Sequence, residues 1–187
     1  MKSSFHFLIL ILLLGSACKK EKTELDKLPE ATRTGQNTGG CLIDGQAFVA
    51  TGWGGGLLSN GIPPLDGGFS LDSLYIVELN GQHKGQNATI TLFFRSQQTG
   101  RYFFNQNTLY FPVGPAQSVR NHATYRVAGA TSGNTYGTGM MQTGYVDFSL
   151  ANVRAGIGAG TFEFTAANTL DPTKIITVTN GRFDRKQ

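Results

Sequence analysis

Three carboxylates in the stretches that alternate apolar and polar residues are the first candidates for acid and base chemistry. Glu163 and Asp147 each stand between two large apolar residues, so their side chains are expected to point to water. Glu78 shares one face of its predicted strand with Leu74 and Ile76. Hydrolysis of a glycosidic bond needs two carboxyl groups at a defined separation, which the sequence does not place. We therefore predict no catalytic residue and a protein that is not an enzyme.

Histidines and aspartates lack the spacing of a metal site. His83 and His122 are far apart, and neither has nearby Cys, Asp or Glu at zinc-ligand spacing. Asp66 and Asp72 offer oxygen ligands for calcium, but without an ordered loop of further ligands. The glycine-rich stretch at 52–56 is not followed by the Lys-Ser or Lys-Thr pair and helix of a phosphate loop. We predict neither a metal nor another cofactor.

Trp53 is the best candidate for a ligand-binding side chain. It is the only tryptophan, and glycines surround it in a predicted loop. A tryptophan presented in this way can stack on a sugar or fill a pocket of a partner protein. The alternative is that Trp53 folds back and covers the end of the core.

The two cysteines, Cys18 and Cys41, stand in different contexts. Cys41 opens the stretch 41–49, in which an Asp-Gly pair separates two short strand-like runs. A free cysteine on a strand usually behaves as a small, inert core residue. A reactive nucleophile and an intermolecular link are the alternatives for Cys41.

Cys18 follows a segment with the layout of a secretory signal peptide. Lys2 supplies positive charge, the run at 5–14 is apolar apart from His6, and three small residues precede the cysteine. A spanning helix would need about 20 apolar residues, and the run at 5–14 is about half that length. The stretch 14–18, Leu-Gly-Ser-Ala-Cys, resembles a bacterial lipobox, although glycine takes the usual place of the leucine. The resemblance implies a signal peptide at 1–17 and acylation of Cys18, which would hold the protein on a membrane without spanning it.

Residues 18–40 are predicted to form the lipidated cysteine and a flexible tether. The stretch contains charges of both signs, a proline and many small polar residues, with Leu25 and Leu28 as its only sizeable apolar side chains. Such a composition buries too little apolar surface to offset the entropy of ordering the chain. A short helix near 21–28 is the alternative, but so short a helix is marginal in water.

Residues 41–187 have the length of one domain and a strand-like pattern nearly throughout. Asn80-Gly81 and Asn180-Gly181 predict places where strands end. No part of this region shows a sustained helical stripe. The alternating runs that carry the prediction lie at 73–79, 88–95, 101–104, 123–127, 144–150, 160–165 and 174–179.

The predicted fold is all-β, an antiparallel β-sandwich of roughly eight to ten strands. Long loops at 52–68 and 113–121 favour a sandwich over the alternative, a lipocalin-like β-barrel with shorter and more even connections. The net charge of +4 does not indicate a nucleic-acid binder, because the arginines are scattered and no nucleic-acid motif accompanies them.

Three short motifs resemble those of small Bacteroidota lipoproteins with an all-β domain. They are Cys-Leu-Ile-Asp-Gly at 41–45, Gly-Thr-Phe-Glu-Phe at 160–164 and Asn-Gly-Arg-Phe-Asp at 180–184. The resemblance implies an exported lipoprotein of the cell envelope, with the outer membrane favoured, and it brings no catalytic residue with it. The expected function is a non-catalytic binding or accessory domain for a polysaccharide or an envelope protein. A carrier of small apolar ligands in a barrel cavity is the alternative, and a hydrolase is a third.

Overall fold

The computed structural model describes residues 22–55, 60–70, 73–110, 119–128 and 134–187. The predicted signal peptide at 1–17 and the predicted lipidation site Cys18 lie outside these residues. None of the helical structure in the described ranges has the length and apolar character needed to cross a membrane. The elements are a 3-10 turn η2 (Leu25–Lys27) and the strands β1 (Thr38–Ile43), β2 (Gln46–Val49), β3 (Leu65–Ser70), β4 (Leu74–His83), β5 (Gln86–Phe94), β6 (Gly100–Phe104), β7 (His122–Val127), β8 (Thr135–Gly137), β9 (Gly144–Asn152), β10 (Ile157–Asn168) and β11 (Ile175–Lys186).

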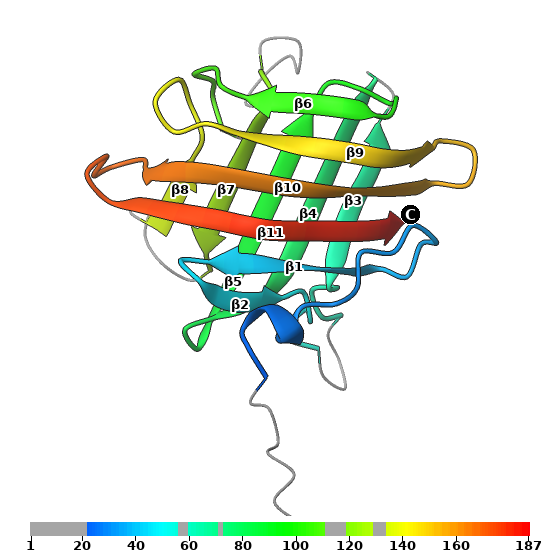
Figure 1. Cartoon of the computed structure of the whole chain (residues 1–187), viewed down its shortest axis with the longest axis horizontal. Coiled ribbons are helices and arrows are strands. Elements are labelled where there is room, and N and C mark those ends of the chain that lie inside the picture. The colour runs from blue at the N-terminus through cyan, green and yellow to red at the C-terminus, as the bar shows by residue number, and fades with distance from the viewer. Residues whose placement is uncertain (1–21, 56–59, 71–72, 111–118, 129–133) are drawn as a thin grey trace, which may run out of the picture.

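All eleven strands belong to one antiparallel sheet. Its order is β2-β1-β11-β10-β8-β7-β5-β4-β3, and β9 and β6 branch from β10. The branch exists because β10 is long: residues 157–164 pair with β9, and Ala167 and Asn168 pair with β8. The sheet curls so strongly that β3, β4, β5, β7 and β8 form a layer behind the other strands and cross them (Figure 1).

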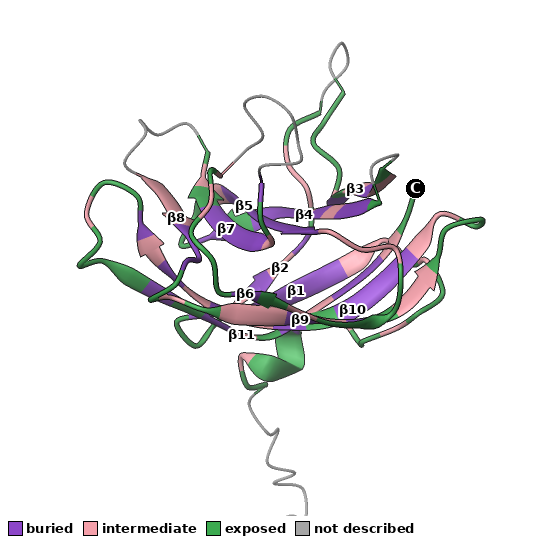
Figure 2. Cartoon of the chain, turned by 90° about the horizontal axis from the view of Figure 1, so that it is seen from above, coloured by how far each residue is buried: buried purple, intermediate pink, exposed green. Residues whose placement is uncertain are grey.

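The predicted all-β, antiparallel class is confirmed. The structure differs in detail, because eleven strands replace the eight to ten expected. The strands also form one continuous half-barrel sheet instead of two separate sheets. Figure 2, seen from above, shows both layers with their buried residues.

The Asp-Gly pair of residues 44 and 45 forms the predicted tight hairpin turn. Asp44 and Gly45 have φ values of 49° and 79°, as a two-residue turn between right-twisted strands requires. The expectation that a strand ends at Asn80-Gly81 is wrong, since β4 runs on to His83. Asn80 stays in the strand because its side chain donates to the carbonyl of Pro63 (3.1 Å) and accepts from the Thr89 hydroxyl (2.9 Å).

The expectation of a strand end at Asn180-Gly181 is also wrong, because β11 continues through both residues. Asn180 has a φ of 53°. It lies at a bulge, where the register with β10 shifts between the pairs Phe162–Gly181 and Phe164–Val178. The turn-forming sequence here makes a bend within a strand.

Aromatic rings fill the space between the two layers. The Tyr75 ring centroid lies 4.6 Å from that of Phe148 and 5.3 Å from that of Phe94. Gly158 allows this packing, because a Cβ there would lie 2.3 Å from the Tyr75 hydroxyl oxygen. Cys41 is fully buried in the same core, as expected for an inert residue, and burial raises the pKa of its thiol. The largest fully buried side chains include Tyr75, Phe48, Phe94, Phe104, Phe148, Phe162 and Phe183.

The segment before β1 is held against the sheet, which differs from the expectation of a flexible tether over residues 18–40. Leu28 is buried, and β1 already begins at Thr38. The buried carboxylate of Asp184 accepts hydrogen bonds from the Thr32 hydroxyl and from the backbone N–H groups of Thr34, Gly35 and Gln36, at 2.7–3.1 Å. The local composition gave no sign of this attachment, because the carboxylate comes from the far end of the chain.

Candidate functional site

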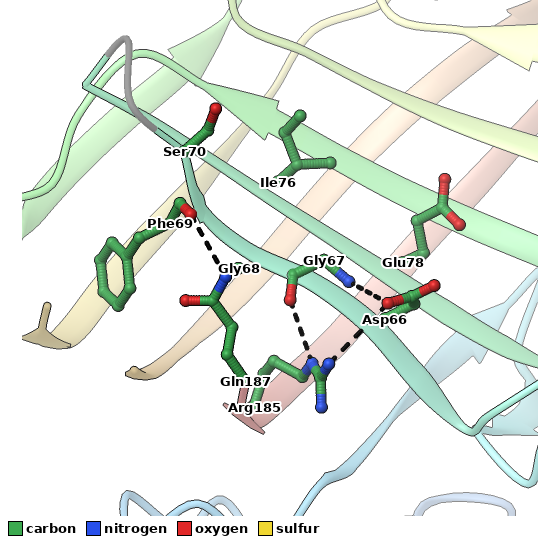
Figure 3. A pocket seen from close by; sticks show the side chains of 9 residues that line it. All are labelled: Asp66, Gly67, Gly68, Phe69, Ser70, Ile76, Glu78, Arg185 and Gln187. Carbon is green, nitrogen blue, oxygen red and sulfur yellow. Dashed lines mark hydrogen bonds and ion pairs between the residues drawn. The ribbon is translucent and has the colours of Figure 1, made fainter. Parts of the chain in front are cut away.

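An open groove of about 550 Å³ runs along the outer edge of β3, and we call it the β3 groove (Figure 3). Its volume lies within the range of small-molecule sites. Its wall combines carboxylate, guanidinium, amide and hydroxyl groups with two apolar side chains. The lining residues are Asp66, Gly67, Gly68, Phe69, Ser70, Ile76, Glu78, Arg185 and Gln187.

Two carboxylates meet in the β3 groove because of the register between β3 and β4. Asp66 and Glu78 are directly opposite each other in the antiparallel ladder. Opposed residues have Cβ atoms about 4.5–5.5 Å apart and side chains on the same face. Figure 3 shows both carboxylates on one side of the groove. Like charges at this separation destabilise a sheet, so the pair marks a place where stability alone does not explain the sequence.

The environment raises the pKa of Glu78. Burial is the largest cause, and the negative charge of Asp66 adds to it. Arg126 and a hydrogen bond with Thr91 act in the opposite direction. Asp66 itself is exposed, accepts a hydrogen bond from the Gly67 N–H (2.7 Å) and lies 3.8 Å from Arg185 Nη2. The groove therefore combines the exposed carboxyl group of Asp66 with the carboxyl group of Glu78, which takes up a proton more readily than usual.

The edge of β3 is covered by side chains instead of another strand. β3 is the last strand in the order of the sheet. Arg185 Nε donates to the Gly67 carbonyl (3.2 Å), and Gln187 Nε2 donates to the Phe69 carbonyl (3.2 Å). Arg185 also donates to Asn37 Oδ1 (2.9 Å), which holds the guanidinium at the edge.

Two glycines give the groove its depth. Gly67 has a φ of 86°, and a Cβ there would lie 2.4 Å from the Ile76 carbonyl oxygen. A Cβ at Gly68 would lie 2.2 Å from side-chain carbons of Gln187. Any larger residue at these positions would collide with the groove wall, so the recess depends on both glycines.

Trp53, the predicted ligand-binding residue, lies outside the β3 groove. Its backbone forms a two-bond bridge with Ile62, with N–H to carbonyl distances of 3.1 and 2.8 Å. The side chain is half-buried, and neither buried core cluster contains it. Ile62 lies shortly before β3, so the bridge ties the Trp53 backbone to the segment that leads into the groove.

The other candidates lie on separate parts of the molecule. Glu163 and Asp147 face outward, as predicted, and they contact the Tyr145 hydroxyl (3.1 Å) and Arg101 (2.6 Å) respectively. The described residues contain no group of three metal-ligating side chains. Asp72, one of the two candidate calcium ligands, lies outside the described residues.

Sequence reasoning singled out Glu78 but missed its partners. The cross-strand pairing with Asp66 and the contribution of Arg185 and Gln187 depend on register and on contacts across more than a hundred residues. Comparison with models of protein families, with curated proteins and with solved structures gives no match.

Proposed function

We propose that the protein is a lipoprotein anchored through Cys18 at the cell envelope, and that its domain binds a neutral polysaccharide in the β3 groove without chemically changing it. One observation carries the binding role: the interior is filled by rings in contact, whereas the groove is open to solvent and lined by both polar and apolar groups. In this proposal the curled sheet works as a filled sandwich of two layers, and the ligand stays on its surface.

The filled interior argues against the alternative of a small apolar ligand carrier. Such a carrier, built as a lipocalin-like barrel, would use its phenylalanines to line a cavity. Here Phe94, Phe148 and Phe183 pack on Tyr75 with ring centroids 4.6–6.0 Å apart. Organic extraction of the purified protein followed by mass spectrometry is expected to yield no stoichiometric apolar ligand beyond the acyl chains.

The chemistry of the groove favours a sugar chain over a protein partner. Sugar hydroxyls are both donors and acceptors, and they match the carboxylates, the Ser70 hydroxyl and the Gln187 amide. Ile76 supplies apolar area for the C–H face of a sugar ring, whereas the Phe69 ring packs on Tyr75 in the core. The carboxylate pair disfavours anionic ligands, which makes a neutral polysaccharide the best match.

A glycan array probed with the mature, detergent-solubilised protein tests this function. We expect retention on neutral oligosaccharides and little on acidic ones. Asp171→Asn, which changes the carboxylate of a surface ion pair with Lys174 outside the groove, serves as the matched control for Asp66→Asn. Capture of an envelope protein with no glycan retained would contradict the proposal.

A hydrolase is the second candidate, because two carboxylates do meet in the groove and the pKa of one is raised. A glycosidase uses two carboxyl groups that flank the bond it cleaves, one protonated and one charged, whereas Asp66 and Glu78 lie on the same side of the groove. In this alternative Glu78 would be the acid and Asp66 the charged partner. Chromatography of the bound oligosaccharide after prolonged incubation separates the two functions: unchanged sugar supports binding alone, and cleavage abolished by Glu78→Gln would support the hydrolase.

A further inference from the structure

A second recess of about 550 Å³ lies at the end of the molecule where the β10–β11 hairpin is found, at the left of Figure 1. We call it the His83 pocket. Loops and strand ends from both layers form this pocket. It shares no lining residue with the β3 groove, so the two sites are separate. Its lining residues are Asp44, His83, Lys84, Gln86, Tyr125, Val127, Asn134, Tyr136, Thr173, Lys174, Ile175 and Ile176.

The pocket has a buried polar pair in its wall. His83 is 6% exposed and Tyr125 is 5% exposed. His83 Nδ1 lies 2.8 Å from the Tyr125 hydroxyl oxygen, and the two rings meet edge to face. The other ring nitrogen, Nε2, is buried and has no hydrogen-bond partner among the described residues. A buried polar atom without a partner costs about 1–3 kcal/mol, so a group that pairs with it gains that free energy.

The Tyr125 contact determines what Nε2 can bind. Burial lowers the pKa of His83, and the charge of Lys84 adds to this effect, so the neutral imidazole is favoured. A neutral imidazole has one N–H and one acceptor nitrogen. Among the described residues, the Tyr125 hydroxyl makes its side-chain hydrogen bond with Nδ1, and in the tautomer that lets it donate there, Nε2 carries the proton. Nε2 is then a donor covered by the wall of the pocket, which a ligand acceptor reaches when the side chains around it move.

The rim of the pocket adds charges that select the ligand further. Lys84 and Lys174 are exposed on the rim, on the β4–β5 turn and the β10–β11 hairpin. Asp44 lies on the β1–β2 turn, where its Oδ1 accepts a hydrogen bond from the Thr177 N–H (2.9 Å). The ammonium groups and the Nε2 donor suit a carboxylate, and Asp44 suits a hydroxyl or ammonium donor on the same molecule.

We infer that the His83 pocket binds a small organic acid that also carries a hydroxyl group, with its carboxylate near Lys84 and Lys174 and accepting from His83 Nε2 once the side chains that cover this atom move aside. This site goes beyond the proposed polysaccharide binding, because it has a different place, charge and ligand class. The ligand is a free hydroxy acid or the acidic end of a sugar chain, and it binds whether or not the β3 groove is occupied.

Titration of the full-length protein with L-lactate and D-glucuronate tests the inference, with lactamide and D-glucose as uncharged counterparts. The readout is the ¹⁵N resonance of the His83 ring nitrogens together with calorimetric affinity. We expect at least one acid to shift Nε2 and to bind with a dissociation constant of about 1 mM or tighter. The uncharged counterparts are expected to leave Nε2 unchanged.

Three variants separate the pocket from a general effect of charge or folding. Lys84→Gln changes an exposed side chain on the rim and is expected to weaken the acid about fivefold or more. Lys186→Gln removes the same charge near the far end of β11 and is expected to leave the affinity unchanged. His83→Gln is expected to abolish the ring signal and weaken binding at least tenfold, with circular dichroism to check the fold.

An unchanged Nε2 resonance with both acids would overturn the inference, and so would equal loss of affinity in Lys84→Gln and Lys186→Gln. The Nε2 resonance could also report a hydrogen bond before either acid is added and stay the same afterwards. That result would show that Nε2 binds a buried water molecule and not the acid. None of these outcomes bears on binding in the β3 groove, so the two sites are tested independently.

Discussion

Replacement of Asp184 by asparagine is expected to lower the free energy of unfolding by about 4–6 kcal/mol. Four groups donate to this carboxylate: the Thr32 hydroxyl, Thr34 N–H and Gln36 N–H contact Oδ2, and Gly35 N–H contacts Oδ1. Asparagine retains one oxygen but presents an NH₂ group to at least one donor. The retained bonds lose the strength that a charged acceptor gives, about 1 kcal/mol each, and the unsatisfied N–H costs a further 1–3 kcal/mol or so.

The pH dependence gives the second half of this prediction. Burial acts to raise the pKa of Asp184, but the hydrogen bonds from Thr32, Thr34, Gln36 and Gly35 outweigh it and hold the pKa below its usual range. Because the pKa of Asp184 is lower in the folded state, the ionised carboxylate stabilises the fold at any pH above the unfolded-state pKa of about 3.9. This stabilisation is lost as the pH falls through the pKa of the folded state. The difference in the free energy of unfolding between wild type and Asp184→Asn should therefore be largest near neutral pH and should decrease below about pH 4.

Urea unfolding of both proteins across this pH range measures the effect, and hydrogen exchange locates it. The amides of Thr34, Gly35 and Gln36 should exchange faster in Asp184→Asn, while β4 and β5 stay protected. Asp147→Asn is the control, because it removes an exposed carboxylate from a surface ion pair with Arg101 and should matter far less. Equal stability of Asp184→Asn and wild type, or a gap that does not change with pH, would refute the reasoning.

Three further predictions concern a loop, the core and a thiol. Trp53→Ala should weaken a long oligosaccharide about tenfold, about 1.4 kcal/mol, if the sugar chain extends beyond the groove to stack on this half-buried ring, and calorimetry with a short and a long oligosaccharide checks this. Equal effects on both lengths would remove Trp53 from the ligand path. Gly158→Ala should lower the free energy of unfolding by about 1–3 kcal/mol, since the new Cβ meets Tyr75, and an unchanged urea midpoint would contradict the packing described. Cys41 should react with a maleimide only after unfolding, because it is fully buried and burial raises its pKa; labelling of Cys41 in the native protein, located by peptide mass spectrometry, would argue against this.

Local patterns in the sequence were enough to predict most of the strands and the direction of many side chains. They missed β3, whose first residues lie in the stretch 52–68 that was expected to be a loop. The alternation in Phe162-Glu163-Phe164 places two rings in the core and the carboxylate outside, as expected. The Asp44-Gly45 pair makes its turn for the same local reason. Such features depend on residues next to each other in the chain.

The features that sequence reasoning missed depend on distant parts of the chain. The Asp184 carboxylate binds a segment about 150 residues earlier, and nothing in the composition of that segment indicates it. The turn signal at Asn80-Gly81 is overridden because Pro63, Pro64 and Thr89 supply hydrogen bonds to Asn80 within the strand. The Asp66–Glu78 pair required the register of two strands, which a single sequence does not give.

The most direct test of the proposed function is the affinity of a neutral oligosaccharide for the wild-type protein and for an Asp66→Asn, Glu78→Gln double variant. We expect the double variant to bind at least tenfold more weakly and Asp171→Asn to bind as the wild type does. We also expect the oligosaccharide to be recovered intact. Equal affinity in all three proteins would contradict the assignment of the β3 groove as the binding site.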